Sequence, residues 1–93
     1  MKLTEKLDLL LKEFYLNDKQ NEDYSLQKAI QDTKIKLSPL ANGKSLARRL
    51  KSEGLVDLKD MKSDMKVTIT DKGRIFCEQT SFAYPGFPII TYF

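Results

Sequence analysis

The residues best suited to chemistry in this chain are cations that lie close together in the sequence. Residues 38–52 carry four basic side chains and no acidic one, whereas residues 1–37 carry seven of each sign and residues 67–93 carry two of each. Concentrated positive charge attracts polyanions such as nucleic acids more strongly than a scattered net charge of +3 would. The four cations are Lys44, Arg48, Arg49 and Lys51.

The same stretch carries signals for the start and the end of a helix. Ser38 can accept a hydrogen bond from the free N–H groups of a first turn, and Pro39 fits the first helical position, where no N–H is needed. Gly54 can adopt the left-handed conformation that ends a helix. In this order, the three residues predict a helix over residues 38–53.

This helix has two unlike faces when it is projected at 100° per residue. The face expected to pack in the core comprises Leu40, Gly43, Leu46, Ala47 and Leu50. The opposite side comprises Ala41, Asn42, Lys44, Ser45, Arg48, Arg49 and Ser52. The small residues on this side allow the helix to lie close to a DNA groove. The long basic side chains beside them can then reach the DNA. The alternative interpretation is an ordinary amphipathic helix with a solvated basic face.

Composition excludes several classes of function. The chain has no histidine and a single cysteine, which removes an internal disulfide, a zinc site and a histidine-based catalytic triad. Cys77 lies in an apolar run and is interpreted as a core residue, and the glycines form no phosphate-binding loop. We therefore expect no enzymatic activity, no metal and no cofactor. Charges interrupt the N-terminal apolar residues, and no apolar run is long enough to span a bilayer, so we expect a cytoplasmic protein without membrane association.

Two helices are predicted ahead of the basic one. Residues 3–16 repeat apolar side chains at helical spacing, with Asp8 among the polar residues turned away, and residues 17–23 read as a polar connector. Ser25 can cap a second, short helix that ends near Thr33. The apolar positions of the two helices are Leu3, Leu7, Leu10, Leu11, Phe14, Leu26, Ala29 and Ile30. Between this helix and the basic one, Ile35 and Leu37 are expected to anchor the chain in the core.

A hairpin and a fourth helix are predicted after Gly54. Residues 55–58 and 65–70 read as strands joined by a polar turn, with Met65, Val67 and Ile69 facing inward. Three lysines are expected on the solvent side of the hairpin: Lys59, Lys62 and Lys66. They contribute either to solubility or to anion binding. Thr70 can cap a short helix through about residue 78 that buries Ile75 and Phe76, with Cys77 as a further candidate.

The end of the chain is unusually apolar. Five aromatic residues and two isoleucines gather around two prolines and a glycine, which predicts an extended tail over residues 81–93 beyond a domain of residues 1–80. Either the tail folds back across the domain, or it packs on another chain. The residues are Phe82, Tyr84, Phe87, Ile89, Ile90, Tyr92 and Phe93.

The order of these elements resembles the winged helix-turn-helix superfamily, especially short bacterial regulators of the multiple-antibiotic-resistance type. The likeness runs from about Leu3 to Glu78 and rests on two motifs: Leu-Ala-Arg-Arg-Leu-Lys-Ser-Glu-Gly-Leu-Val from residue 46, and Val-Thr-Ile-Thr-Asp-Lys-Gly-Arg from residue 67. It implies an α+β fold with three helices, a β-hairpin wing and a short fourth helix, to which the sequence adds the extended aromatic tail. Departures from the pattern are Gly43 in the middle of the predicted helix and a wing without arginine.

The resemblance implies sequence-specific binding of double-stranded DNA by a transcriptional regulator, with the helix over residues 38–53 in the major groove and the wing on the backbone. Such proteins commonly dimerise, and here the first helix and the tail are the segments available for a homodimer. The competing interpretation is a winged-helix protein-interaction module that uses the apolar tail. The DNA-contacting residues carried over are Asn42, Lys44, Ser45, Arg48 and Arg49 on the helix, and Lys59, Lys62 and Lys66 on the wing.

Overall fold

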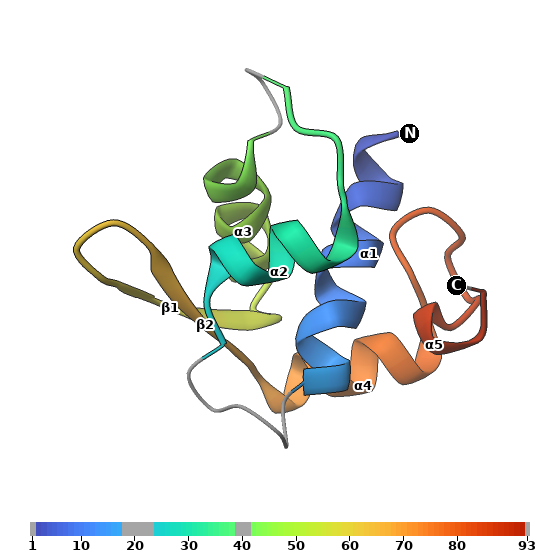
Figure 1. Ribbon diagram of the computed structural model, residues 1–93. Helices are drawn as coiled ribbons and strands as arrows, with labels where there is room; N and C mark the ends of the chain where they lie inside the picture. The colour runs from blue at the N-terminus through green and yellow to red at the C-terminus, as the bar shows by residue number, and fades with distance from the viewer. Residues whose placement is uncertain (1, 18–23, 39–41, 93) are drawn as a thin grey trace.

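The first helix, α1 (Leu3–Asn17), is the element on which the other parts of the fold pack. The computed structural model describes residues 2–17, 24–38 and 42–92. Within them α1 contacts every other helix and the second strand (Figure 1). The order is three helices, a two-stranded antiparallel hairpin and two further helices, which confirms the expected α+β class. No helix in these ranges is long and apolar enough to cross a membrane.

The predicted apolar stripe of α1 is confirmed from Leu7 to Phe14, but Leu3 is 48% exposed, and the expectation for Asp8 is wrong as well. Leu7, Leu10, Leu11 and Phe14 are buried. Asp8, expected to face solvent, is fully buried, because a segment more than seventy residues later packs on its side of the helix. The expected connector over residues 17–23 lies outside the described residues, apart from Asn17.

The second helix, α2 (Leu26–Thr33), begins where the sequence predicted. Ser25 is its N-cap, and its hydroxyl accepts a hydrogen bond of 3.0 Å from the N–H of Lys28. The helix ends at Lys34, which has a left-handed φ of 55°. Ile35 is then buried as expected, but Leu37 is 47% exposed, so the prediction that it anchors the core is wrong.

The third helix, α3 (Gly43–Ser52), starts four residues later than predicted, since its first helical residue is Gly43 and not Pro39. Asn42 is the N-cap, and Ser38 lies in the non-helical connector. Of the residues expected in the first turn, Pro39, Leu40 and Ala41 lie outside the described ranges. The other end is as predicted, since Gly54 follows the helix with a φ of 77°.

The late start of α3 changes the role of Gly43. It is the first helical residue, so the expected cost of a glycine in the helix interior does not arise. Instead, α2 packs closely here: a Cβ atom at this position would lie 3.3 Å from Cγ1 of Ile30.

The hairpin joins β1 (Val56–Asp60) to β2 (Met65–Ile69). In its register Val56 lies opposite Ile69, and Leu58 lies opposite Val67. The inward-facing residues Met65, Val67 and Ile69 are buried, which confirms the alternation. The chain just before α2 extends the sheet by one bridge between Ser25 and Lys66. This bridge fixes the start of α2 against the hairpin.

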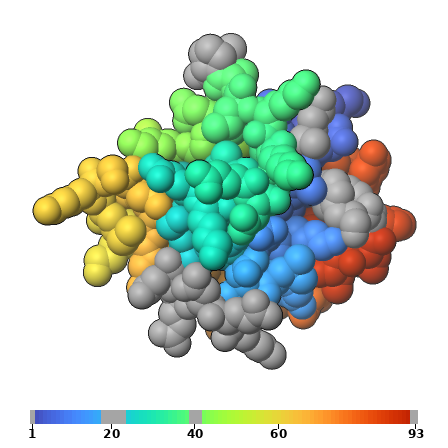
Figure 2. Space-filling view, viewed as in Figure 1, coloured from blue at the N-terminus to red at the C-terminus, as the bar shows by residue number. Residues whose placement is uncertain are grey.

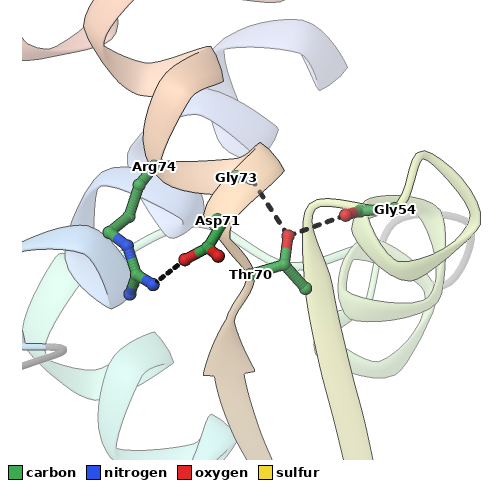
Figure 3. Close-up of polar contacts among 5 residues, drawn as sticks. All are labelled: Gly54, Thr70, Asp71, Gly73 and Arg74. Carbon is green, nitrogen blue, oxygen red and sulfur yellow. Dashed lines mark hydrogen bonds and ion pairs between the residues drawn. The ribbon is translucent and has the colours of Figure 1, made fainter.

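The threonine and glycine after β2 form a tight joint between three elements (Figure 3). Thr70 caps the fourth helix, α4 (Asp71–Gln79), by accepting a hydrogen bond of 3.0 Å from the N–H of Gly73. Its hydroxyl also donates to the carbonyl of Gly54 at 2.7 Å, which ties α4 to the end of α3. Arg74 and Asp71 pair on the outer side.

The end of the chain folds back on its own domain. The carboxylate of Asp8 accepts hydrogen bonds from the N–H groups of Phe82 and Ala83, at 2.7 and 2.9 Å. Ile89 is fully buried at the start of a one-turn helix, α5 (Ile89–Tyr92). The expectation of a wholly extended tail is therefore wrong.

The apolar residues near the C-terminus do not form one cluster. Phe82 packs on Phe76, with ring centroids 4.8 Å apart, whereas Tyr84 and Phe87 are about half exposed. In α4 Cys77 is fully buried, but Ile75 is 51% exposed, so its predicted burial is wrong. α4 packs through the side that carries Gly73 and Cys77, and Ile75 points elsewhere.

Candidate nucleic-acid interface

The exposed side of α3 is basic. Leu46, Ala47 and Leu50 are buried against the core, which turns the intervening cations outward. Within the described residues of this helix there is no acidic side chain, and the first one follows it at Glu53. The exposed cations are Lys44, Arg48, Arg49 and Lys51.

Asn42 and Ser45 lie beside these cations but are occupied by the start of the helix. The side-chain oxygen of Asn42 accepts a hydrogen bond of 2.9 Å from the N–H of Ser45. In return, the hydroxyl of Ser45 donates to the carbonyl of Asn42 at 2.9 Å. Because the oxygen of the Asn42 side chain is used in this cap, Asn42 would contact DNA through its side-chain N–H groups. These are donors, so their best targets are acceptor atoms of phosphates or bases.

Arg49 differs from its neighbours because it has an acidic partner. Its Nε atom lies 3.5 Å from Oε1 of Glu53, one turn further along. Both side chains are about half exposed, and ion pairs of this kind contribute little to stability. The pair can therefore open at small cost, but it partly neutralises the charge at this end of α3.

The hairpin brings two of its three candidate lysines directly together. Lys59 on β1 lies opposite Lys66 on β2, on the outer side of the ladder. Lys62 is exposed in the connection between the strands.

A groove of about 520 Å³ lies between α2, the start of α3 and the beginning of β2. Figure 2 shows these three elements side by side on one face of the molecule. Four of the residues predicted to contact DNA line this groove. They lie there beside apolar residues that the sequence analysis did not single out as functional. The lining residues most relevant here are Leu26, Ile30, Leu37, Met65, Lys44 and Arg48.

The titratable groups with clearly shifted pKa values lie outside this candidate interface. Burial raises the pKa of Tyr24, and its hydroxyl donates toward carboxylates of Glu13 and Asp32. Burial also raises the pKa of the Cys77 thiol to about 12, with the Asp8 charge adding to the effect. A buried thiol that stays protonated is a poor nucleophile. No group of three or more metal-ligating side chains occurs within the ranges that the structure describes.

Comparison with known proteins returned no match. No family model, no curated protein and no solved structure matches the chain.

Some features of the site had a sequence signal, and others had none. Asn42 followed by Gly43 is a recognisable helix start, but it competed with Ser38 followed by Pro39. The groove had no local signal, because it forms only where three separate segments meet.

Proposed function

We propose that the protein binds double-stranded DNA as a winged helix-turn-helix regulator, with α3 entering the major groove and the hairpin touching the backbone. The observation that carries this proposal is the exposed face of α3, where four cations stand without an acidic residue in the helix. Three helices followed by an antiparallel hairpin are compatible with that family. An α-helix fits the width of the major groove.

The candidate residues support two kinds of contact. Lys59 and Lys66 face outward as a like-charged pair, which suits phosphates rather than bases. On α3, the guanidinium group of Arg48 can donate two parallel hydrogen bonds to a guanine edge, and Lys44 can reach a base or a phosphate. With four to seven neutralised phosphates, log K would fall against log salt with a slope of about −3.6 to −6.3.

The experiment is DNA binding by paired charge variants. We expect Lys44→Gln with Arg48→Gln to weaken binding by roughly tenfold or more, because each base contact is worth about 1–3 kcal/mol. Lys2→Gln with Lys6→Gln removes the same charge from the residue before α1 and from its first turn, and serves as the control. If both double variants lose affinity equally, binding is a response to net charge and not to α3.

We also propose a homodimer through the C-terminal segment and α1. Tyr84 is 54% exposed, Phe87 50% and Ile90 38%, although the segment itself is docked on the domain. Figure 1 places this segment on the side away from the hairpin, so a dimer would leave the DNA face open. Truncation is unsuitable as a test because Ile89 belongs to the core.

The dimer proposal is tested by sedimentation of the full chain and of Tyr84→Ser with Phe87→Ser. We expect a dimer at micromolar concentration that dissociates in the double variant. The wild type remaining monomeric at high micromolar concentration would refute it.

A second candidate function is protein interaction through the same exposed side chains. Large exposed apolar residues often mark a binding surface. This candidate predicts no salt-dependent DNA binding, so the DNA assay separates it from the first one.

A further inference from the structure

We infer that a polar clamp between α2 and the turn of the hairpin positions the hairpin lysines for DNA. The clamp consists of Gln27 at the start of α2 and of Ser63 and Asp64 at the end of the turn. None of the three is among the residues predicted to contact DNA. The effect of the clamp on DNA affinity rests on the proposed function, whereas its effect on the order of the hairpin does not.

The hairpin is packed in the core at its base, and its turn projects beyond the helices (Figure 1). Val56 and Ile69 at the base are buried. Nearer to the turn, Lys59, Asp60 and Lys62 are exposed. A two-stranded hairpin is at best marginally stable when nothing else holds it. Its lysines therefore keep one position relative to α3 only if the turn is attached to another element.

Two hydrogen bonds attach the turn to the start of α2. Nε2 of Gln27 donates to the carbonyl of Ser63 at 2.8 Å, and the N–H of Gln27 donates to Oδ1 of Asp64 at 3.1 Å. The same carboxylate oxygen accepts from the N–H of Met65 at 2.7 Å, and the Asp64 carbonyl accepts from the N–H of Met61 at 2.9 Å. Asp64 thus closes the turn and ties it to α2.

Asp64 lies where the start of a helix favours a carboxylate. The first N–H groups of a helix have no partner within the helix and carry a partial positive charge. Ser25 accepts from the N–H of Lys28, and Asp64 accepts from that of Gln27 although it belongs to another element. An acidic residue in a hairpin with three lysines therefore has a structural reason to be there.

The clamp also relates the hairpin to α3, because α2 packs against both. Gly43 at the start of α3 lies against Ile30, one turn after Gln27 on α2. Lys44 and Arg48 line the same groove as the clamped end of the turn. The clamp therefore fixes the spacing between the cations of α3 and those of the hairpin. Cations held at a fixed spacing lose less conformational freedom when they bind phosphates, which favours affinity.

The clamp and simple charge predict opposite effects of replacing Asp64. Asp64→Ala and Asp64→Asn remove the same negative charge, which by itself should strengthen binding to DNA. Asparagine keeps a side-chain oxygen that can accept from the N–H groups of Gln27 and Met65, whereas alanine has none. We expect Asp64→Asn to bind duplex DNA as tightly as the wild type or up to about threefold more tightly, and Asp64→Ala to bind roughly threefold to tenfold more weakly.

A second variant tests the clamp from the side of α2 without a change of charge. Gln27→Met keeps the length of the side chain and removes the donor to Ser63, and the exposed backbone bond to Asp64 remains. Gln79→Met, at an exposed position of α4, is the matched control. We expect Gln27→Met to weaken DNA binding roughly twofold to fourfold and Gln79→Met to leave it unchanged. If Asp64→Ala does not fold, this pair decides the test.

A positioning role requires that the clamp act through the hairpin lysines. Asp64→Ala should therefore cause no further weakening in a variant that already lacks them, with Lys59, Lys62 and Lys66 all changed to glutamine. In the Lys44→Gln, Arg48→Gln variant the weakening by Asp64→Ala should persist, because α3 is a separate set of contacts. A general loss of stability would weaken binding in both backgrounds.

The order of the hairpin is measured without DNA, by backbone order parameters for residues 61–63 from NMR relaxation. We expect about 0.85, the value of a rigid backbone, in the wild type and in Asp64→Asn, and a clear decrease in Asp64→Ala. Hydrogen exchange at the N–H of Gln27 should be faster in Asp64→Ala and unchanged in Asp64→Asn.

These measurements separate the clamp from the proposed function. If the wild type binds DNA and Asp64→Ala binds as tightly as Asp64→Asn, the inference is overturned, and the same holds if the effect of Asp64→Ala survives the loss of the three lysines. A wild type that binds no duplex DNA refutes the proposed function. Order parameters that still differ between the two variants would then show a clamp without a role in DNA binding, and equal ones would remove the clamp as well.

Discussion

Replacing Gly73 by alanine should destabilise the domain, although the substitution favours helix formation. A Cβ atom on Gly73 would lie 2.1 Å from the carbonyl oxygen of Leu55 and 2.7 Å from Cγ1 of Ile69. Contacts shorter than 3.0 Å essentially do not occur, so the backbone of α4 and the chain before β1 must separate by about 0.9 Å. The Leu55 carbonyl also accepts a hydrogen bond of 3.0 Å from the N–H of Thr70, which that separation would stretch.

Three contributions set the magnitude of the effect. Exchanging glycine for alanine within a helix gains about 0.5–1 kcal/mol. Overpacking costs about 1–3 kcal/mol, and weakening one backbone hydrogen bond costs up to about 1.5 kcal/mol. The net loss is about 2 kcal/mol, which in a domain of this size lowers the midpoint of thermal unfolding by about 8–16 °C.

Thermal unfolding followed by circular dichroism measures this effect, and Gly43→Ala is the matched control. The Cβ atom added there meets the flexible side chain of Ile30 at 3.3 Å and not backbone, so we expect its midpoint within about 4 °C of the wild type. A Gly73→Ala variant that melts at or above the wild-type temperature would refute the close packing of this joint.

Three further perturbations test other parts of the structure. Leu50→Ala removes a fully buried side chain of α3 and should cost about 2–5 kcal/mol in urea unfolding; an unchanged midpoint would mean that the helix faces the other way. Asp8→Asn places an amide N–H₂ group beside the N–H groups of Phe82 and Ala83, and should cost about 1–3 kcal/mol; unchanged hydrogen exchange at both amides would contradict the tether. Burial raises the pKa of Cys77 to about 12, above its ordinary value of 9.0, so its contribution to stability is complete below pH 9 and declines above it. The stability of the wild type relative to Cys77→Ala should therefore fall as pH rises from 9, and a constant difference would refute the shift.

Local signals in the sequence were sufficient for most of the fold. The spacing of apolar residues predicted α1 and the buried side of β2. The serine and threonine caps predicted where α2 and α4 begin. These features depend on residues that lie a few positions apart in the chain, so they can be predicted from the sequence without knowledge of the fold. The clash that would follow from a side chain on Gly73 gives a physical reason for the glycine three residues after Thr70 in the second motif of the resemblance, Val-Thr-Ile-Thr-Asp-Lys-Gly-Arg.

Features that depend on distant contacts were not predictable in this way. Asp8 borders the apolar stripe of α1, and only the later segment that packs there makes its burial favourable. The start of α3 had two competing cap signals, and packing of Gly43 against Ile30 suits the later one. Leu37 is apolar but lies beside the groove, so its hydrophobicity alone predicted the wrong environment.

The candidate site was predictable in its chemistry but not in its shape. The cations of α3 and the lysines of the hairpin were identified because charge is visible in the sequence. The direct opposition of Lys59 and Lys66 and the groove beside Lys44 depend on strand register and on three segments meeting.

The central claim, that the basic face of α3 binds double-stranded DNA, is tested most directly by affinity for mixed-sequence duplex DNA at two salt concentrations. Four to seven phosphate contacts predict a loss of roughly 150-fold to 6,000-fold in affinity between about 50 and 200 mM salt. The Lys44→Gln, Arg48→Gln double variant should bind more weakly at both concentrations, with a smaller salt slope if its contacts are to phosphates. Binding that is absent at the lower salt concentration, or that is the same in wild type and variant, would contradict the claim.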